Sequence, residues 1–236
     1  MDSELNEFVE KLSKAHKDNL KAIVLYGTAV EGVQFDDETP KKALIVVGHL
    51  TTDDLKAAHE VADWWREVGN PLPVYFTEEE LQQASDVFPI EFIDMSRVRH
   101  VLYGKDPFEE LQILTHNLRH QLEYELRGKL IRLRSLYFPA SKNPNRLATL
   151  MADSLDSFVV LFRHVLEVFG IEAPVERNDV LLRLADELQL DKTVFARIAE
   201  YRKDEEIWLE SETTETFAAY LKLLERVIRA VDEQPE

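Results

Sequence analysis

One basic window stands out in an otherwise acidic chain. Between Glu125 and Asp153 there is no Asp or Glu but there are six basic residues, so this window carries +6 in a protein of net charge −17. Such a cluster can form a local site for a nucleotide phosphate, an RNA segment or an acidic partner. The alternative is that its members form salt bridges with acidic neighbouring helices. The six residues are Arg127, Lys129, Arg132, Arg134, Lys142 and Arg146.

A second pattern has the spacing of metal ligands. His116 and His120 are four residues apart, and Glu123 follows one turn later. On a helix these side chains share a face, and two histidines with a carboxylate can bind zinc. No glutamate follows the first histidine, as a zinc protease would require, and seven histidines in 236 residues make such pairs common by chance. His116 and His120 are therefore weak metal candidates beside an ordinary packing role.

The elements that must position these residues differ between the two halves of the chain. The first half mixes short apolar runs rich in β-branched residues with short amphipathic helices. We predict strands at residues 22–26, 43–47, 74–76 and 89–94, the last at a sheet edge because it opens with proline. Helices are predicted at residues 6–20 and 52–68, and Thr77 is a good N-cap for a further one.

From Pro107 onward almost the whole sequence has helical periodicity. Leucines recur at spacings of three, four or seven, and the pattern predicts about five helices packed as an antiparallel bundle. The expected helices are residues 109–137, 146–169, 178–188, 192–203 and 212–231. The fold class is therefore predicted to be α+β, with a small α/β domain over residues 1–106 and a helical bundle over residues 107–236.

The segment Leu25–Val47 reads LYGTAVEGVQFDDETPKKALIVV, a strand ending in Gly-Thr, a loop with a second glycine, and another apolar strand. This order resembles the nucleotidyltransferase fold of the polymerase-beta superfamily, particularly its minimal and aminoglycoside-modifying members. The stretches at residues 91–95 and 101–104 resemble the family's later strand and the "vlyG" segment that follows it. A helical bundle after the catalytic domain is also common there and contributes to substrate binding.

The resemblance implies a specific site. Small residues after the first strand let backbone N–H groups approach nucleotide phosphates, which assigns Gly27 and Thr28 as phosphate contacts. Two aspartates on the next strand, with a third carboxylate from a later strand, hold the Mg²⁺ ions that clamp the phosphoryl group. In this sequence Lys41 and Ala43 occupy the two aspartate positions, and Glu91 matches the third carboxylate.

This departure predicts a domain that is defective in metal-dependent nucleotidyl transfer. A lysine and an alanine cannot replace two Mg²⁺ ligands, although Lys41 can supply positive charge where the metals would. Asp36 and Asp37, in the acidic loop before the second strand, are weak substitute ligands because a loop lacks the fixed geometry of a strand. Mg²⁺ is expected as a cofactor only if that loop takes over.

Composition limits the remaining choices. Apolar residues make up 45% of the chain, which is enough for a buried core. The net charge of −17 disfavours broad binding to nucleic acid, and the absence of cysteine excludes thiolate chemistry and disulfides. No apolar run is long enough to span a membrane, and the acidic start does not resemble a leader peptide, so we expect a cytoplasmic protein.

The leading hypothesis is a nucleotidyltransferase-like protein that has lost its metal-binding aspartates. It is expected to bind a nucleotide or another small anion in a cleft between the two domains, through Gly27, Thr28, Lys41, Arg127 and Arg134. One alternative is an active nucleotidyltransferase with rearranged metal ligands. The other is a non-enzymatic interaction protein that forms a homodimer through its bundle.

Overall fold

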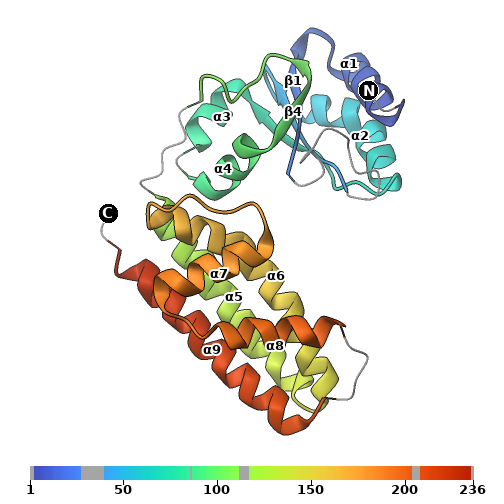
Figure 1. Cartoon of the computed structure of the whole chain (residues 1–236). Helices are drawn as coiled ribbons and strands as arrows, with labels where there is room; N and C mark the ends of the chain where they lie inside the picture. Colours follow the sequence, from blue (N-terminus) through green and yellow to red (C-terminus); the bar gives the residue numbers. More distant parts are fainter. Residues whose placement is uncertain (1–2, 28–39, 86, 112–116, 204–207, 235–236) are drawn as a thin grey trace. The chain divides into compact units, whose positions relative to one another are not determined.

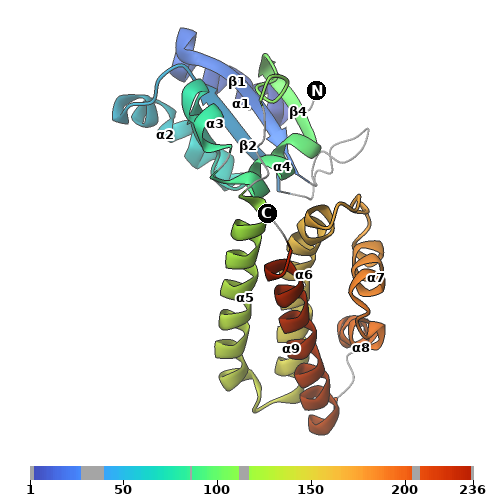
Figure 2. The same ribbon diagram turned by 90° about the vertical axis from the view of Figure 1, so that its left-hand side faces the viewer.

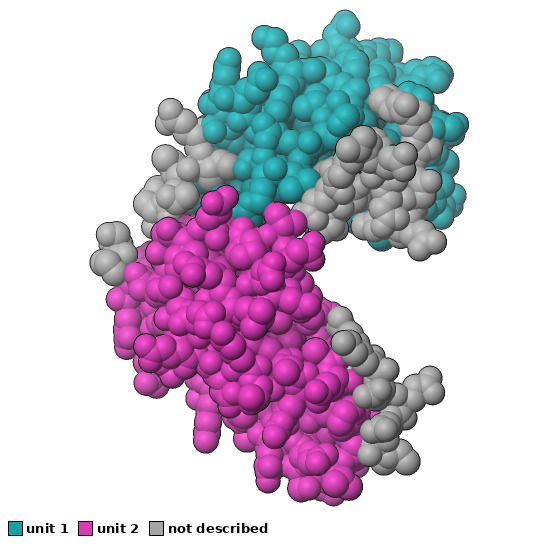
Figure 3. All heavy atoms as spheres, viewed as in Figure 1, with its two compact units in different colours: residues 1–115 teal, residues 116–236 magenta. Residues whose placement is uncertain are grey.

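The computed structural model describes residues 3–27, 40–85, 87–111, 117–203 and 208–234. Residues 1–115 and 116–236 form two compact units, coloured separately in Figure 3. The first contains a four-stranded sheet with helices, and the second is entirely helical in its described part. The predicted α+β class, a sheet domain followed by a helical bundle, is confirmed.

Four strands form the sheet of the first unit in the order β3-β2-β1-β4. β1 (Leu20–Tyr26) lies antiparallel to both β2 (Lys42–Val47) and β4 (Arg99–Gly104), whereas β3 (Val74–Thr77) lies parallel to β2. Three of these strands stand where the sequence predicted them, within two residues at each end.

Helices cover both faces of this sheet (Figures 1 and 2). α1 (Ser3–His16) and α2 (Thr52–Glu67) pack on one face, where Phe8 and Trp65 stack with 3.9 Å between ring centroids. α3 (Glu78–Ala84) and α4 (Pro89–Arg97) pack on the other face through Leu81, Phe92 and Met95. Because both faces are buried, the central strands are continuously apolar rather than alternating.

The predicted strand at residues 89–94 is wrong, because this segment is the helix α4. Proline at the first helical position has a backbone angle already suited to a helix. The buried residues Pro89, Phe92 and Met95 recur every three residues, which the apparent alternation of Ile90 and Phe92 concealed. The fourth strand is β4, which contains the "vlyG" stretch.

The second unit contains five described helices. α5 (Leu118–Ala140) and α6 (Pro144–Val168) are the longest pair, and α9 (Glu210–Asp232) packs against both. α7 (Arg177–Leu188) and α8 (Lys192–Lys203) lie against α6. α5 continues through Pro139 and ends at Ala140, three residues later than predicted. In the described residues, no helix is both long and apolar enough to cross a bilayer.

Acidification is expected to destabilise the first unit through His16, which is buried at the end of α1. Its Nε2 lies 3.1 Å from the Tyr75 hydroxyl, and burial lowers the pKa of His16, an effect that the charge of Asp54 partly opposes. The folded state therefore binds this proton less readily than the unfolded state. The contribution of neutral His16 to the free energy of unfolding should be fully present above the unfolded pKa of about 6.5. It should be lost as the pH falls below that value.

The measurement is the urea midpoint of unfolding between pH 8 and pH 5. His16→Gln should flatten the curve relative to wild type, whereas His59→Gln, which alters an exposed histidine of α2, should not. Identical pH dependence in His16→Gln and wild type would show that His16 does not carry the effect.

Candidate functional site

Gly27 directly follows β1, at the end of that strand where the resemblance places the phosphate. Its φ is +85°, a conformation that favours glycine, and its N–H donates to the Val98 carbonyl at 3.0 Å. A Cβ at this position would lie 3.9 Å from Cδ of Lys42. Lys42 is exposed at the start of β2, so Gly27 and an accessible lysine are neighbours. Thr28 lies outside the described residues.

Lys41, the lysine assigned to the site from the sequence, is turned the other way. Its side chain is 4% exposed, and its Nζ lies 3.9 Å from Oε1 of Glu4 in α1. Its backbone N–H donates to Oδ1 of Asn70 at 2.8 Å, and Nδ2 of Asn70 donates to the same Glu4 oxygen at 3.1 Å. Lys41 thus joins the start of β2 to α1 and to the segment after α2. Its ammonium group is held inside the unit rather than presented to a ligand.

Ala43 lies two residues further along β2, on the same face of the sheet. It is 1% exposed and belongs to the core cluster that includes Phe8, Ile45 and Trp65. The two positions that the resemblance assigns to aspartates are therefore both buried in this unit. Carboxylates at these two positions would be buried, which is costly unless they are paired.

Glu91 does not stand on a strand, as the resemblance implied. It is exposed in the first turn of α4. In the described part of the chain, no group of three or more His, Asp or Glu side chains is arranged to hold a metal ion. The described residues thus do not fit the Mg²⁺ site of the resembling family. Asp36 and Asp37 lie outside the described residues.

The histidine pair is described only in part, because His116 lies outside the described residues. His120 is exposed on α5, where its ring contacts the guanidinium of Arg119. Glu123 forms ion pairs with Arg119 and Arg127. The carboxylate that completed the predicted zinc set is therefore engaged by two arginines.

Two members of the basic window form ion pairs within the bundle. Nε of Arg127 lies 2.6 Å from Glu123, and its Nη2 lies 3.5 Å from Asp232 of α9. Arg134 lies 2.7 Å from Glu225, also in α9. For these two residues the salt-bridge alternative describes the contacts that the structure contains. Their role as nucleotide contacts stays a prediction.

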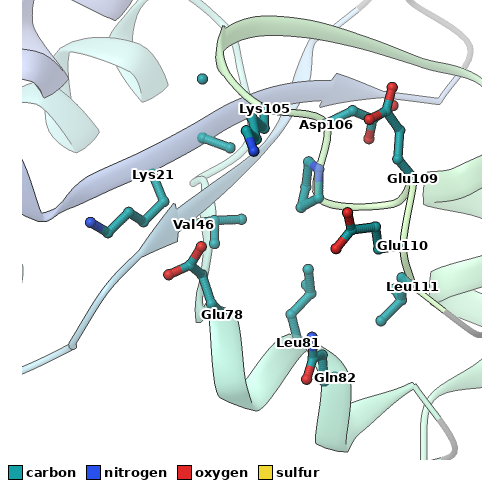
Figure 4. A pocket seen from close by; sticks show the side chains of 13 residues that line it. Lys21, Val46, Glu78, Leu81, Gln82, Lys105, Asp106, Glu109, Glu110 and Leu111 are labelled. Atoms are coloured by element: carbon teal, nitrogen blue, oxygen red, sulfur yellow. The ribbon is translucent and has the colours of Figure 1, made fainter.

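A hollow that the sequence did not point to lies at the opposite end of β1, beside α3 (Figure 4). Its volume is about 580 Å³, and its lining includes two lysines and four carboxylates. Burial acts to raise the pKa of Asp106, but hydrogen bonds from Arg99 and the Phe108 N–H hold that pKa below its usual value. The charged residues are Lys21, Lys105, Glu78, Asp106, Glu109 and Glu110. This excess of carboxylate disfavours phosphate, so Gly27 and Lys42 form the better anion site.

No family model matches the sequence, and no curated protein matches it either. Among solved structures, the chain is similar to a spectinomycin adenyltransferase, AAD(9), from Enterococcus faecialis, solved with ATP and spectinomycin. The identity is 15%, the TM-score is 0.48, and the match covers 99% of this chain and 100% of that one.

The toxin–antitoxin MntA–HpeT, solved as a D39ED41E mutant, is similar at 16% identity and a TM-score of 0.32. That match covers 52% of this chain and 93% of the other. At this identity neither likeness brings an activity or a substrate to this chain.

Proposed function

We propose that this chain is a nucleotidyltransferase-like protein that does not carry out metal-dependent nucleotidyl transfer. The sequence resemblance assigns the family's aspartate positions to Lys41 and Ala43, and one observation supports the proposal: both residues lie in the core, 3% and 1% exposed. A two-metal mechanism needs carboxylates that reach both the ions and the phosphoryl group. These two side chains supply no carboxylate, and they face α1 and α2 instead of solvent.

The same end of the sheet retains the features that bind an anion. Gly27 has no side chain to block a ligand, while its own N–H is donated to the Val98 carbonyl, and Lys42 supplies an exposed positive charge beside it. We therefore assign the binding of a nucleotide or another small anion to Gly27 and Lys42. In this proposal Lys42 has the electrostatic role that is predicted for Lys41 from the sequence.

Two measurements test the two parts of this proposal. Incubation with α-labelled ATP, GTP, CTP or UTP and Mg²⁺ should give no transfer of label to the protein or to added acceptors. Transfer that disappears in Asp36→Asn or Asp37→Asn would overturn the defect and support an active enzyme with rearranged ligands.

Binding is measured by isothermal titration with the same four nucleotides. Lys42→Ala should weaken the affinity about tenfold, the loss of one charged contact of about 1.4 kcal/mol. Lys56→Ala, which removes an exposed lysine of α2, is the matched control and should bind as wild type does. No heat of binding with any nucleotide would remove the anion-site assignment and leave the catalytic defect standing.

A further inference from the structure

The outward surface of α5 carries large apolar side chains that the bundle does not cover. Tyr124, Ile131 and Phe138 are 76%, 63% and 74% exposed. They are seven residues apart, so they lie along one line on the helix. Leu136, 41% exposed, lies further round α5, on the side that faces α6. A regular apolar line of this kind is typical of a helix that packs against another helix.

A hollow of about 550 Å³ runs between α5 and α6 next to this line. Leu133 and Phe158 are almost fully buried at its base. Its charged lining consists of Glu125, Lys129, Arg132 and Asp153. Two positive and two negative side chains give the hollow no net charge, so it matches neither a strongly acidic nor a strongly basic partner. It suits a surface with the same mixture of charges.

Gly128 lies at the centre of the exposed surface of α5. A glycine inside a helix costs about 0.5–1 kcal/mol relative to alanine. A Cβ placed on Gly128 would meet nothing within 4 Å, so no close contact within the described protomer requires glycine here. A second helix that approaches closely at this point would give the glycine a physical reason.

Glu125 and Arg132 indicate how a partner helix would be oriented on this surface. They are seven residues apart on one side of α5, about 10 Å along the helix axis, which is too far for them to pair with each other. The described residues provide neither of them with an ion pair, in contrast to Arg127 and Arg134. Suppose that a second copy of α5 crosses the first in the antiparallel direction, with the two-fold axis between the copies passing between residues 128 and 129. Residue i of one copy then faces residue 257 − i of the other. Glu125 then faces Arg132 of the second copy, and Arg132 faces its Glu125.

We propose that the α5–α6 surface binds a second copy of this chain, with the two α5 helices antiparallel and crossing at Gly128. Tyr124 of each copy packs beside Ile131 of the other, on the flank of the same crossing. The occupant is a second copy because the charges of this surface are complementary to themselves across a two-fold axis, as an isologous interface requires. The reciprocal pair of Glu125 and Arg132, with the balanced charge of the hollow, satisfies that condition. This proposal is independent of nucleotide binding.

Charge reversal tests the pairing in the full-length protein. Sedimentation equilibrium should show a wild-type dimer, and Glu125→Arg or Arg132→Glu alone should weaken it at least tenfold, because like charges then face each other. The double reversal should restore the affinity to within about threefold, since the attractive pairs reform with opposite sign. Lys222→Glu, at an exposed site on α9, is the control and should leave the dimer unchanged.

The absence of native cysteine allows a second, geometric test. Under mild oxidation, Gly128→Cys should form a disulfide-linked dimer within minutes, because each introduced thiol lies next to its own copy at the crossing. Lys222→Cys should stay monomeric on a denaturing gel. A wild-type monomer at all concentrations would overturn the proposal. So would a dimer that is indifferent to both reversals, or a double reversal as weak as the single ones.

Discussion

Ala43→Asp is expected to destabilise the first unit by more than about 4 kcal/mol, enough to unfold it at room temperature. Ala43 is 1% exposed and lies among Phe8, Ile45 and Trp65. The substitution would bury a carboxylate in an apolar cluster, and burial of a charged group is among the costliest single changes in a protein. The residue type that the resembling family requires at this position is thus one that this core excludes.

Trp64 and Trp65 report unfolding of the first unit by fluorescence, provided that Trp208 is first replaced by phenylalanine. In that background Ala43→Asp should show little or no urea transition. Lys42→Asp is the matched control, because it places the same carboxylate one residue away at an exposed position. It should keep a transition within about 1 kcal/mol of the parent. Equal stability of the two variants would show that position 43 opens to solvent and would revive the metal-site interpretation.

Strong local signals made most of the elements predictable. The apolar runs at residues 22–26 and 43–47 coincide with β1 and β2, and Thr77 caps α3 as predicted. A six-residue segment such as 89–94 can satisfy a period of two and a period of three at once, so the apolar pattern did not distinguish a strand from the helix α4. Proline is compatible with an edge strand and with the first position of a helix, and Pro89 begins the helix α4.

The site was less predictable, since the sequence does not reveal which face of a doubly covered strand meets which helix. Lys41 and Lys42 are adjacent and chemically identical, so pattern alone could not separate the buried lysine from the exposed one. Their assignment depends on Glu4 and Asn70, which lie 37 residues before and 29 residues after Lys41 in the chain. Tertiary contacts of this range leave no local signature.

Gly104→Ala is the second substitution with a large expected effect, because Gly104 ends β4 where that strand meets β1. Its φ is +78°, and a Cβ there would stand 1.9 Å from the carbonyl oxygen of Lys21, far inside van der Waals contact. Gly104 pairs with Ala22 in the β1–β4 ladder, so relieving the clash requires the two strands to separate. β4 is an edge strand, which makes its detachment the expected response.

Gly69→Ala separates the two contributions to the loss of stability expected at Gly104, which are backbone strain and the steric clash of the added Cβ. Gly69 also has a positive φ, +96°, but a Cβ there meets nothing within 4 Å. Its substitution should cost about 1–2 kcal/mol from backbone strain alone. Gly104→Ala should cost at least about 2 kcal/mol more, read from the same fluorescence transition in urea. If the two variants unfold at the same urea concentration, backbone strain accounts for both, and the close approach of β1 to β4 does not constrain residue 104. If Gly104→Ala unfolds at a lower urea concentration than Gly69→Ala, strand packing requires the glycine of the "vlyG" stretch. A resemblance in sequence alone does not explain that requirement.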